Sequence, residues 1–188
     1  SNKEICMVKV RLMKPKDTYQ MLKWGTNKDV RLLHYNFTYN TKSECKMWYY
    51  SKRKFLRKKL FGIFKNDLLV GYITFKRINW FFRKAWLGIA LDPNYTNQGI
   101  GQIALKKFLD IVFEKYYMKS VYLKVASFNL RAINCYKKVG FEIYDVKEIV
   151  YEEQQLLLEE NRYKAFDYFK IRNNKIYTKY YIMRVNRT

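Results

Sequence analysis

The sequence predicts one α/β domain built on a mixed, mostly antiparallel sheet, and three observations lead to this fold class. The chain has 188 residues, of which 49% are hydrophobic, and this is enough for a single core. Two pairs of apolar segments joined by short Asn-containing turns indicate antiparallel hairpins. Between them, an apolar strand, a glycine turn, an amphipathic helix and a second strand follow one another over residues 86–125.

The first forty residues predict a strand, a short helix and an irregular segment. Residues 5–13 alternate between apolar and basic side chains, as a strand does. Asp17 is expected to cap the helix, with Gln20 at the spacing of a capping box and Gly25 as the stop. The irregular segment, residues 25–40, contains several aromatic side chains, which we expect to pack on the core. The alternative is that its ring side chains line a substrate site; these are His34, Tyr35, Phe37 and Tyr39.

A second capping box predicts the next helix, and a hairpin follows it. Thr41 and Glu44 have the required spacing. Residues 51–60 are strongly basic, which is typical of a solvated helix end or, alternatively, of phosphate contacts with nucleic acid. Residues 60–65 and 68–76 then read as the two strands of a hairpin.

The turn after this hairpin carries the aromatic triplet Trp80-Phe81-Phe82 between basic residues. We expect these side chains to pack into the core, and a patch for a partner or a membrane surface is the alternative. Towards the end of the chain, residues 143–150 predict a strand, and residues 150–163 predict an inserted, acidic helix. A hairpin over residues 166–185, turning at Asn173-Asn174, closes the fold.

The glycine turn is the segment that points most directly to chemistry. The strand that ends at Leu91 breaks at Asp92-Pro93, and Gly99-Ile100-Gly101 then opens the helix. Backbone N–H groups at the start of a helix have no intrahelical partner and favour an anion. The spacing of the glycines matches neither a dinucleotide-binding fingerprint nor a P-loop.

Two motifs in this region resemble the acetyl-CoA-binding half of the GNAT superfamily of N-acetyltransferases. The pattern Q/R-x-x-G-x-G/A falls on residues 96–101, with Thr96 in place of the usual Arg or Gln. The pattern N-x-x-A-x-x-x-Y-x-K-x-G-F falls on residues 129–141. Trp24 and the stretch 87–93 also resemble the branch of ribosomal-protein alanine N-acetyltransferases. The resemblance implies a GNAT-like single domain over 1–188, with about seven strands and helices on both faces.

The resemblance also implies a cofactor site and a catalytic residue. Tyr136 is expected to be the general acid that protonates the departing thiolate. Acetyl-CoA is the expected co-substrate, held along the strand, on the amides of the glycine turn and by the next helix; the expected residues are Ile89, Ala90, Leu91, Thr96, Asn97, Gln98, Gly99, Ile100, Gly101, Gln102 and Asn129.

The general base is left open by the sequence. Asp92, Glu44 and His34 are the candidates, and Asp92 is equally a turn former. Cys135 beside the tyrosine permits an acyl-cysteine intermediate, although direct transfer is the usual course in the superfamily. With one histidine and three cysteines at unrelated spacings, we expect no metal.

The net charge of +22 bears on partners and substrate. Because a positive field repels polycations, we expect the acceptor amine on a neutral or anionic molecule. The resemblance implies a protein N-terminus or a nucleotide-linked amino sugar as that acceptor. The alternative is a non-catalytic module that binds CoA, nucleic acid or the ribosome. The acidic segment, residues 150–163, has three possible roles: it docks on the chain's own basic surface, it docks on a second copy and so forms a homodimer, or it is a solvated helix. Reduced cysteines, no signal-peptide pattern and no membrane-spanning run lead us to expect a cytoplasmic protein.

Overall fold

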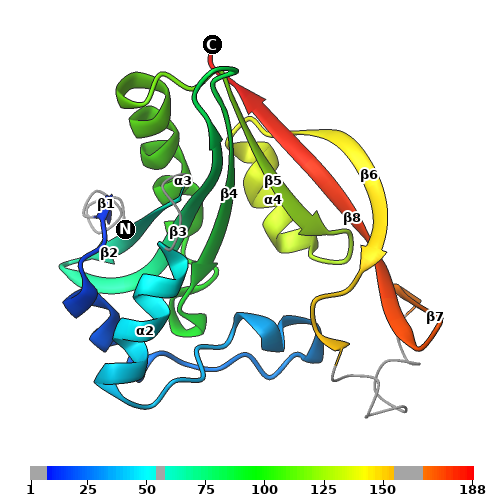
Figure 1. Cartoon of the computed structure of the whole chain (residues 1–188), viewed down its shortest axis with the longest axis horizontal. Coiled ribbons are helices and arrows are strands. Elements are labelled where there is room, and N and C mark those ends of the chain that lie inside the picture. The colour runs from blue at the N-terminus through cyan, green and yellow to red at the C-terminus, as the bar shows by residue number, and fades with distance from the viewer. Residues whose placement is uncertain (1–7, 54–57, 155–166) are drawn as a thin grey trace.

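The computed structural model describes residues 8–53, 58–154 and 167–188, and within them the chain forms one eight-stranded sheet. The strand order is β1-β2-β3-β4-β5-β8-β6, and β7 pairs with β8 outside this path (Figure 1). The strands are β1 (Val8–Leu12), β2 (Lys59–Lys65), β3 (Leu68–Asn79), β4 (Lys84–Leu91), β5 (Ser120–Ala126), β6 (Glu142–Val150), β7 (Phe169–Arg172) and β8 (Lys175–Asn186). All pairs are antiparallel except β4 with β5, so the predicted mixed sheet is confirmed.

Helices cover both faces of this sheet, as predicted. They are the 3-10 segments η1 (Pro15–Lys23), η2 (Val30–Tyr35) and η3 (Pro93–Tyr95), the α-helices α2 (Lys42–Lys52), α3 (Ile100–Asp110) and α4 (Leu130–Lys138), and the π-helical turn η4 (Ile111–Lys115). The main core lies between the sheet and the α3–α4 side. A smaller core around Trp48 and Met21 packs α2 and η1 on the other side, against β2 and β3.

Both predicted hairpins form, and their turns show why. Asn66-Asp67 joins β2 to β3 and Asn173-Asn174 joins β7 to β8. All four residues have positive φ, between 48° and 63°. Two-residue hairpin loops require this conformation, and Asn and Asp tolerate it better than other residues with a side chain.

The two predicted capping boxes have different outcomes. Thr41 and Glu44 cap α2 as expected, with the Glu44 N–H donating to Thr41 Oγ1 (3.2 Å) and the Thr41 N–H donating to the Glu44 carboxylate (2.9 Å). The cap assigned to Asp17 is wrong, because η1 begins two residues earlier at Pro15. The Asp17 carboxylate instead accepts the Lys14 N–H (2.7 Å) and forms an ion pair with Arg11 (2.8 Å).

The prediction that the aromatic turn packs into the core is wrong, because its three aromatic side chains are exposed. Trp80 is 49% exposed, Phe81 86% and Phe82 59%. The buried member of this segment is Ile78, after which the β3–β4 hairpin turns. Of the predicted inserted helix, residues 151–154 form no α-helix, and the remainder falls outside the described residues.

The parallel pairing of β4 with β5 is short, and this leaves part of the β4 edge unpaired. Only Lys84, Ala85 and Trp86 of β4 pair with β5, at Ser120 to Tyr122. Beyond them the two strands diverge, as the open side of the sheet in Figure 1 shows. The edge of β4 from residue 87 to 91 that faces β5 is therefore left without a strand partner. Among the described residues, no helix is long and apolar enough to cross a membrane.

Candidate active site

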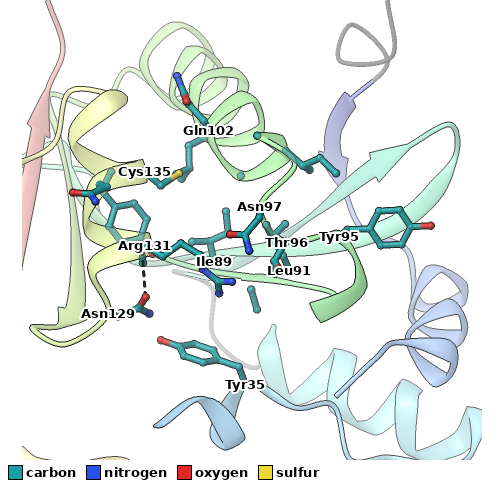
Figure 2. A pocket seen from close by; sticks show the side chains of 18 of the residues that line it. Tyr35, Ile89, Leu91, Tyr95, Thr96, Asn97, Gln102, Asn129, Arg131 and Cys135 are labelled. Carbon is teal, nitrogen blue, oxygen red and sulfur yellow. Dashed lines mark hydrogen bonds between the residues drawn. The ribbon is translucent and has the colours of Figure 1, made fainter. Parts of the chain in front are cut away.

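A cavity of about 410 Å³ opens where β4 and β5 diverge (Figure 2). It is bounded by the end of β4, the start of α3, the first turns of α4 and the segment around η2. All the residues that the sequence assigned to the cofactor and to catalysis line this cavity, with one exception; they are Ile89, Ala90, Leu91, Thr96, Asn97, Gly99, Ile100, Gly101, Gln102, Asn129 and Tyr136.

The exception is Gln98, whose side chain turns away from the cavity. Its Nε2 donates to the Asn94 carbonyl (3.2 Å), and its Oε1 lies 3.4 Å from Lys65 Nζ. The Gln98 side chain thus braces the turn. Thr96 also has a local role, because its hydroxyl donates to the Pro93 carbonyl (3.0 Å).

The start of α3 presents free amides to the cavity. Gly99 caps the helix in the left-handed conformation (φ +74°), which glycine adopts without strain. The Ile103 N–H is the first to donate back into the helix, to the Gly99 carbonyl (3.2 Å). Within the described residues, the N–H groups of Ile100, Gly101 and Gln102 therefore lack a backbone acceptor, and this arrangement favours an anion.

Gly101 lies where α3 meets β4 and α4. A Cβ at this position would lie 3.4 Å from the side chain of Leu91 on β4 and 3.7 Å from Cys135 Sγ on α4. Both are ordinary van der Waals distances, and they show that the start of α3 packs against the end of β4. This places the free amides beside the unpaired edge of that strand.

Helix α4 contributes Asn129, which the sequence predicted, and two cations, which it did not. Asn129 caps the helix, with its Oδ1 accepting the Ala132 N–H (3.2 Å). Arg131 and Lys138 line the cavity, and Figure 2 shows Arg131 extending from α4 toward the loop that carries Asn97. The sequence could have indicated Arg131 as a site residue, because it lies between Asn129 and Ala132 of the motif, on the first turn of the helix.

Tyr136 is buried against this cavity, at 9% exposure. Burial raises the pKa of Tyr136 far above its usual value, and the charge of Arg131 opposes this effect. The hydroxyl therefore remains a proton donor at any physiological pH. Burial also raises the pKa of the half-buried Cys135, so that this residue is a thiol rather than a thiolate nucleophile.

The opposite wall carries Tyr35 and, behind it, an ionisable cluster. The rings of Tyr35 and His34 are 4.0 Å apart. His34 Nε2 lies 3.8 Å from Glu152 Oε2, and Lys124 Nζ lies 2.8 Å from the other carboxylate oxygen. His34 Nδ1 is buried and has no hydrogen-bond partner among the described residues.

The charge states in this cluster follow from burial and from the Lys124 contact. Burial lowers the pKa of His34 in spite of the neighbouring carboxylate, so the imidazole is neutral near pH 7. Burial is the largest single effect and would raise the pKa of Glu152, but the hydrogen bond and charge of Lys124, together with His34 and Lys76, keep the pKa below its usual value. The cluster is thus a neutral imidazole beside an ionised carboxylate.

The other two candidates for the base have structural roles. Asp92 is buried, and its Oδ1 accepts the N–H groups of Gly25 and Asn94, each at 3.0 Å. Glu44 is engaged in the cap of α2. None of the three sequence candidates lines the cavity itself, and His34 adjoins it through the ring of Tyr35.

A half-buried lysine adds positive charge on the same side. Lys76 of β3 lies near Gly88 of β4, since its Nζ would be 3.8 Å from a Cβ there. Burial lowers the pKa of Lys76, and the nearby cations Lys58 and Arg77 lower it further. No group of His, Cys, Asp and Glu among the described residues has the arrangement of a metal site.

Comparisons with known proteins agree with this geometry. The profile of the Acetyltransferase (GNAT) family matches residues 27–141, more than half of the chain. A spermidine N(1)-acetyltransferase of Vibrio cholerae is 29% identical over 73 residues, which cover 39% of this chain and 42% of that protein. The acetyltransferase PseH of Campylobacter jejuni is 28% identical over 88 residues, or 47% of this chain and 54% of PseH. The chain therefore matches about half, or less, of the length of these curated relatives.

Solved structures extend the likeness in fold to nearly the whole chain. The spermidine N-acetyltransferase of Vibrio cholerae in complex with CoA and spermine superposes with a TM-score of 0.69, at 19% identity and over 96% of both chains. A dodecameric structure of the enzyme from that organism has a TM-score of 0.65 at 17% identity, over 96% of this chain and 94% of that one. The family profile, the two motifs and the shared fold together establish that this chain belongs to the GNAT acetyltransferase family.

Proposed function

We propose that the protein transfers an acetyl group from acetyl-CoA directly to a primary amine. The observation that supports this most strongly is the single cavity that joins the free amides of α3, the unpaired edge of β4 and the Tyr136 hydroxyl. An anion site, a row of backbone groups and a proton donor are what a phosphorylated thioester needs to be held and cleaved.

In this proposal the chain's own residues have separate tasks. The amides of residues 97–102, together with Arg131, hold the diphosphate. The β4 edge at residues 89–91 and Asn129 align the pantetheine arm, and a β4 N–H polarises the thioester carbonyl. Tyr136 donates to the sulfur as the carbon–sulfur bond breaks, because its raised pKa keeps the hydroxyl protonated.

The base is His34, supported by Glu152. The amine must lose a proton as it bonds to the acetyl carbon, and a neutral imidazole accepts that proton. The adjacent carboxylate stabilises the imidazolium that forms. The pair stands behind Tyr35, on the side of the cavity opposite α4.

The acceptor is an amine carried by an anionic or neutral molecule, such as a nucleotide-linked amino sugar or a protein N-terminus. Lys76 gives this side of the site positive charge, because the charges of Glu152 and Lys124 offset each other in their ion pair. A polyamine would meet repulsion there. In this respect the proposal departs from the substrate that the names of the Vibrio relatives state.

Calorimetry and a thiol-release assay test the proposal in two stages. Calorimetric titration with CoA at low ionic strength is expected to show stoichiometric binding. The enzyme with acetyl-CoA is then expected to release free thiol with acceptors that carry phosphate or carboxylate, and to be slow with spermidine. Binding without turnover on any amine would mean a non-catalytic CoA module, and turnover on cationic amines alone would contradict the acceptor class. A cytoplasmic setting and a homodimer remain predictions.

A further inference from the structure

The tip of the β3–β4 hairpin exposes three large aromatic side chains, Trp80, Phe81 and Phe82, and the segment between η4 and β5 exposes Tyr117; we call these four residues the apex. Their exposed fractions are 49%, 86%, 59% and 60%. Scattered exposed apolar residues need no explanation, but adjacent ones at a protruding turn do. Figure 1 shows this end of the sheet beside the C-terminus, away from the open side between β4 and β5.

The turn is held in this conformation by its own contacts. The Phe82 N–H donates to Asn79 Oδ1 (2.9 Å). The Arg83 carbonyl accepts the N–H of Lys119 (2.7 Å), which ties the turn to the start of β5. The rings of Phe81 and Phe82 contact each other at 4.9 Å. The aromatic side chains are thus displayed on a braced turn and do not fold back onto the core.

Positive charge surrounds the apex on the elements next to it. The exposed cations are Arg77, Arg83, Lys84, Lys119 and Arg187, and the last is joined to Lys119 by a backbone hydrogen bond (2.9 Å). Lys59 stacks on Tyr116, which in turn contacts Trp80 at 6.3 Å. One acid, Glu114, pairs with Arg187 at 3.6 Å. The local excess follows the net charge of the chain, +22.

We propose that the apex docks the protein on an anionic lipid surface. Aromatic side chains enter the interface between headgroups and acyl chains, and Lys and Arg around them pair with anionic headgroups. A hairpin turn that leaves Phe81 86% exposed fits a lipid surface. Single-stranded nucleic acid is bound in grooves whose aromatic rings present open faces for stacking, whereas the rings of Phe81 and Phe82 meet edge to face, with an interplanar angle of 86°.

Docking in this orientation leaves the active site accessible. The apex lies at the Lys84 end of β4, and the cavity lies at the Leu91 end. The inference is therefore independent of the acetyl-transfer proposal. CoA binding serves as a check on folding for every apex variant.

Cosedimentation with vesicles tests this surface. The protein is expected to bind vesicles of phosphatidylcholine and phosphatidylglycerol in equal parts, to ignore vesicles of phosphatidylcholine alone, and to detach as salt rises. Phe81→Ser with Phe82→Ser is expected to lower the partition coefficient by about tenfold or more. The matched control is Met47→Ser with Tyr50→Ser on α2, which replaces side chains of similar exposure, 62% and 59%, and is expected to leave binding unchanged.

A second pair of variants tests the role of the cations. Arg83→Glu with Lys84→Glu is expected to reduce vesicle binding by about tenfold or more, because each cation near an anionic surface contributes severalfold. Lys106→Glu with Lys107→Glu on α3 makes the same change in net charge and is expected to have a much smaller effect, since screening limits the field to about 10 Å.

Four results would overturn the inference. One is the absence of binding to the anionic vesicles at low salt. Another is equal loss in the apex and control variants, which would mean that net charge alone acts. A third is Phe81-dependent binding of single-stranded RNA without vesicle binding. The last is a Phe81-dependent dimer in sedimentation analysis without vesicle binding, which would assign the apex to a second copy of the chain.

Discussion

His34 Nε2 lies 3.8 Å from Glu152 Oε2, although 118 residues separate the two in the sequence. The contact joins the segment around η2 to the segment that follows β6. A second contact joins the same two segments, because the Tyr151 hydroxyl donates to the Arg31 carbonyl (2.8 Å). The pair is therefore fixed to the cavity wall by the fold and not by a local turn.

Replacing His34 with Gln is expected to lower kcat by about a hundredfold or more, as loss of a general base does. In the parent enzyme, kcat/KM is expected to fall as the pH decreases through a pKa below the ordinary value of 6.5, because only the neutral imidazole accepts a proton and burial lowers its pKa. Steady-state kinetics across pH check both. If the variant kept the parent rate and the same decrease in kcat/KM at acid pH (the acid limb of the profile), His34 would be excluded as the general base.

Glu152→Gln provides the matched measurement for the same pair. Removing the carboxylate removes the charge that favours the imidazolium, so the acid limb is expected to move to lower pH. CoA affinity is expected to be unchanged, since the carboxylate lies outside the CoA part of the cavity. A limb that moved to higher pH would contradict the electrostatic role.

Tyr136→Phe is expected to lower kcat by about a hundredfold or more while leaving the dissociation constant of CoA almost unchanged. The change removes one hydroxyl and keeps the ring that packs on Phe141 at 6.0 Å. Calorimetry and thiol release measure the two quantities separately. Equal losses in binding and rate would instead assign Tyr136 to packing of the cofactor.

Arg131→Ala is expected to raise the dissociation constant of CoA by about tenfold, with a weaker salt dependence, because one cation facing the phosphates is lost. Lys137→Ala is the control, since Lys137 is an exposed cation on the same helix that does not line the cavity. Titrations at two salt concentrations compare them. The same loss of CoA affinity in both variants would mean that the overall positive charge of the protein, and not a contact of Arg131, favours CoA binding.

Lys76→Glu is expected to shift acceptor preference from anionic toward cationic amines by about tenfold or more in relative kcat/KM, because the local charge is reversed. The lysine is half-buried, so the measurement includes the thermal midpoint and CoA binding. Lys46→Glu on the exposed face of α2 controls for net charge. An unchanged preference with retained activity would remove Lys76 from the acceptor site.

Asp92→Ala is expected to destabilise the protein by about 1–3 kcal/mol, because the partly buried N–H groups of Gly25 and Asn94 lose the acceptor that the buried Asp92 provides. Asp92→Asn keeps an oxygen in place and is expected to cost less. Urea denaturation gives the free energies. If Asp92→Asn lost activity with unchanged stability, Asp92 would have a catalytic role and not a structural one.

The sequence by itself determined the local elements of this protein. The hairpin turns, the α2 cap, the glycine entry to α3 and the run from Asn129 to Phe141 depend on neighbours a few residues apart. Backbone conformation and capping act over that range, so spacing alone identifies them. The predicted cofactor residues come from three separate elements, and the resemblance to the family, not local spacing, indicated that they would meet in one cavity, as all but Gln98 do.

Only the tertiary structure decided which side chains from distant segments meet, and which stay outside. It brought Glu152 to His34, engaged Asp92 with Gly25, and turned Gln98 toward Lys65. It also left Phe81 exposed, which an apolar triplet in a sequence does not reveal. The physical reason is that burial and pairing depend on how the strands are ordered and where β4 and β5 part, and this order is set by packing across the whole sheet.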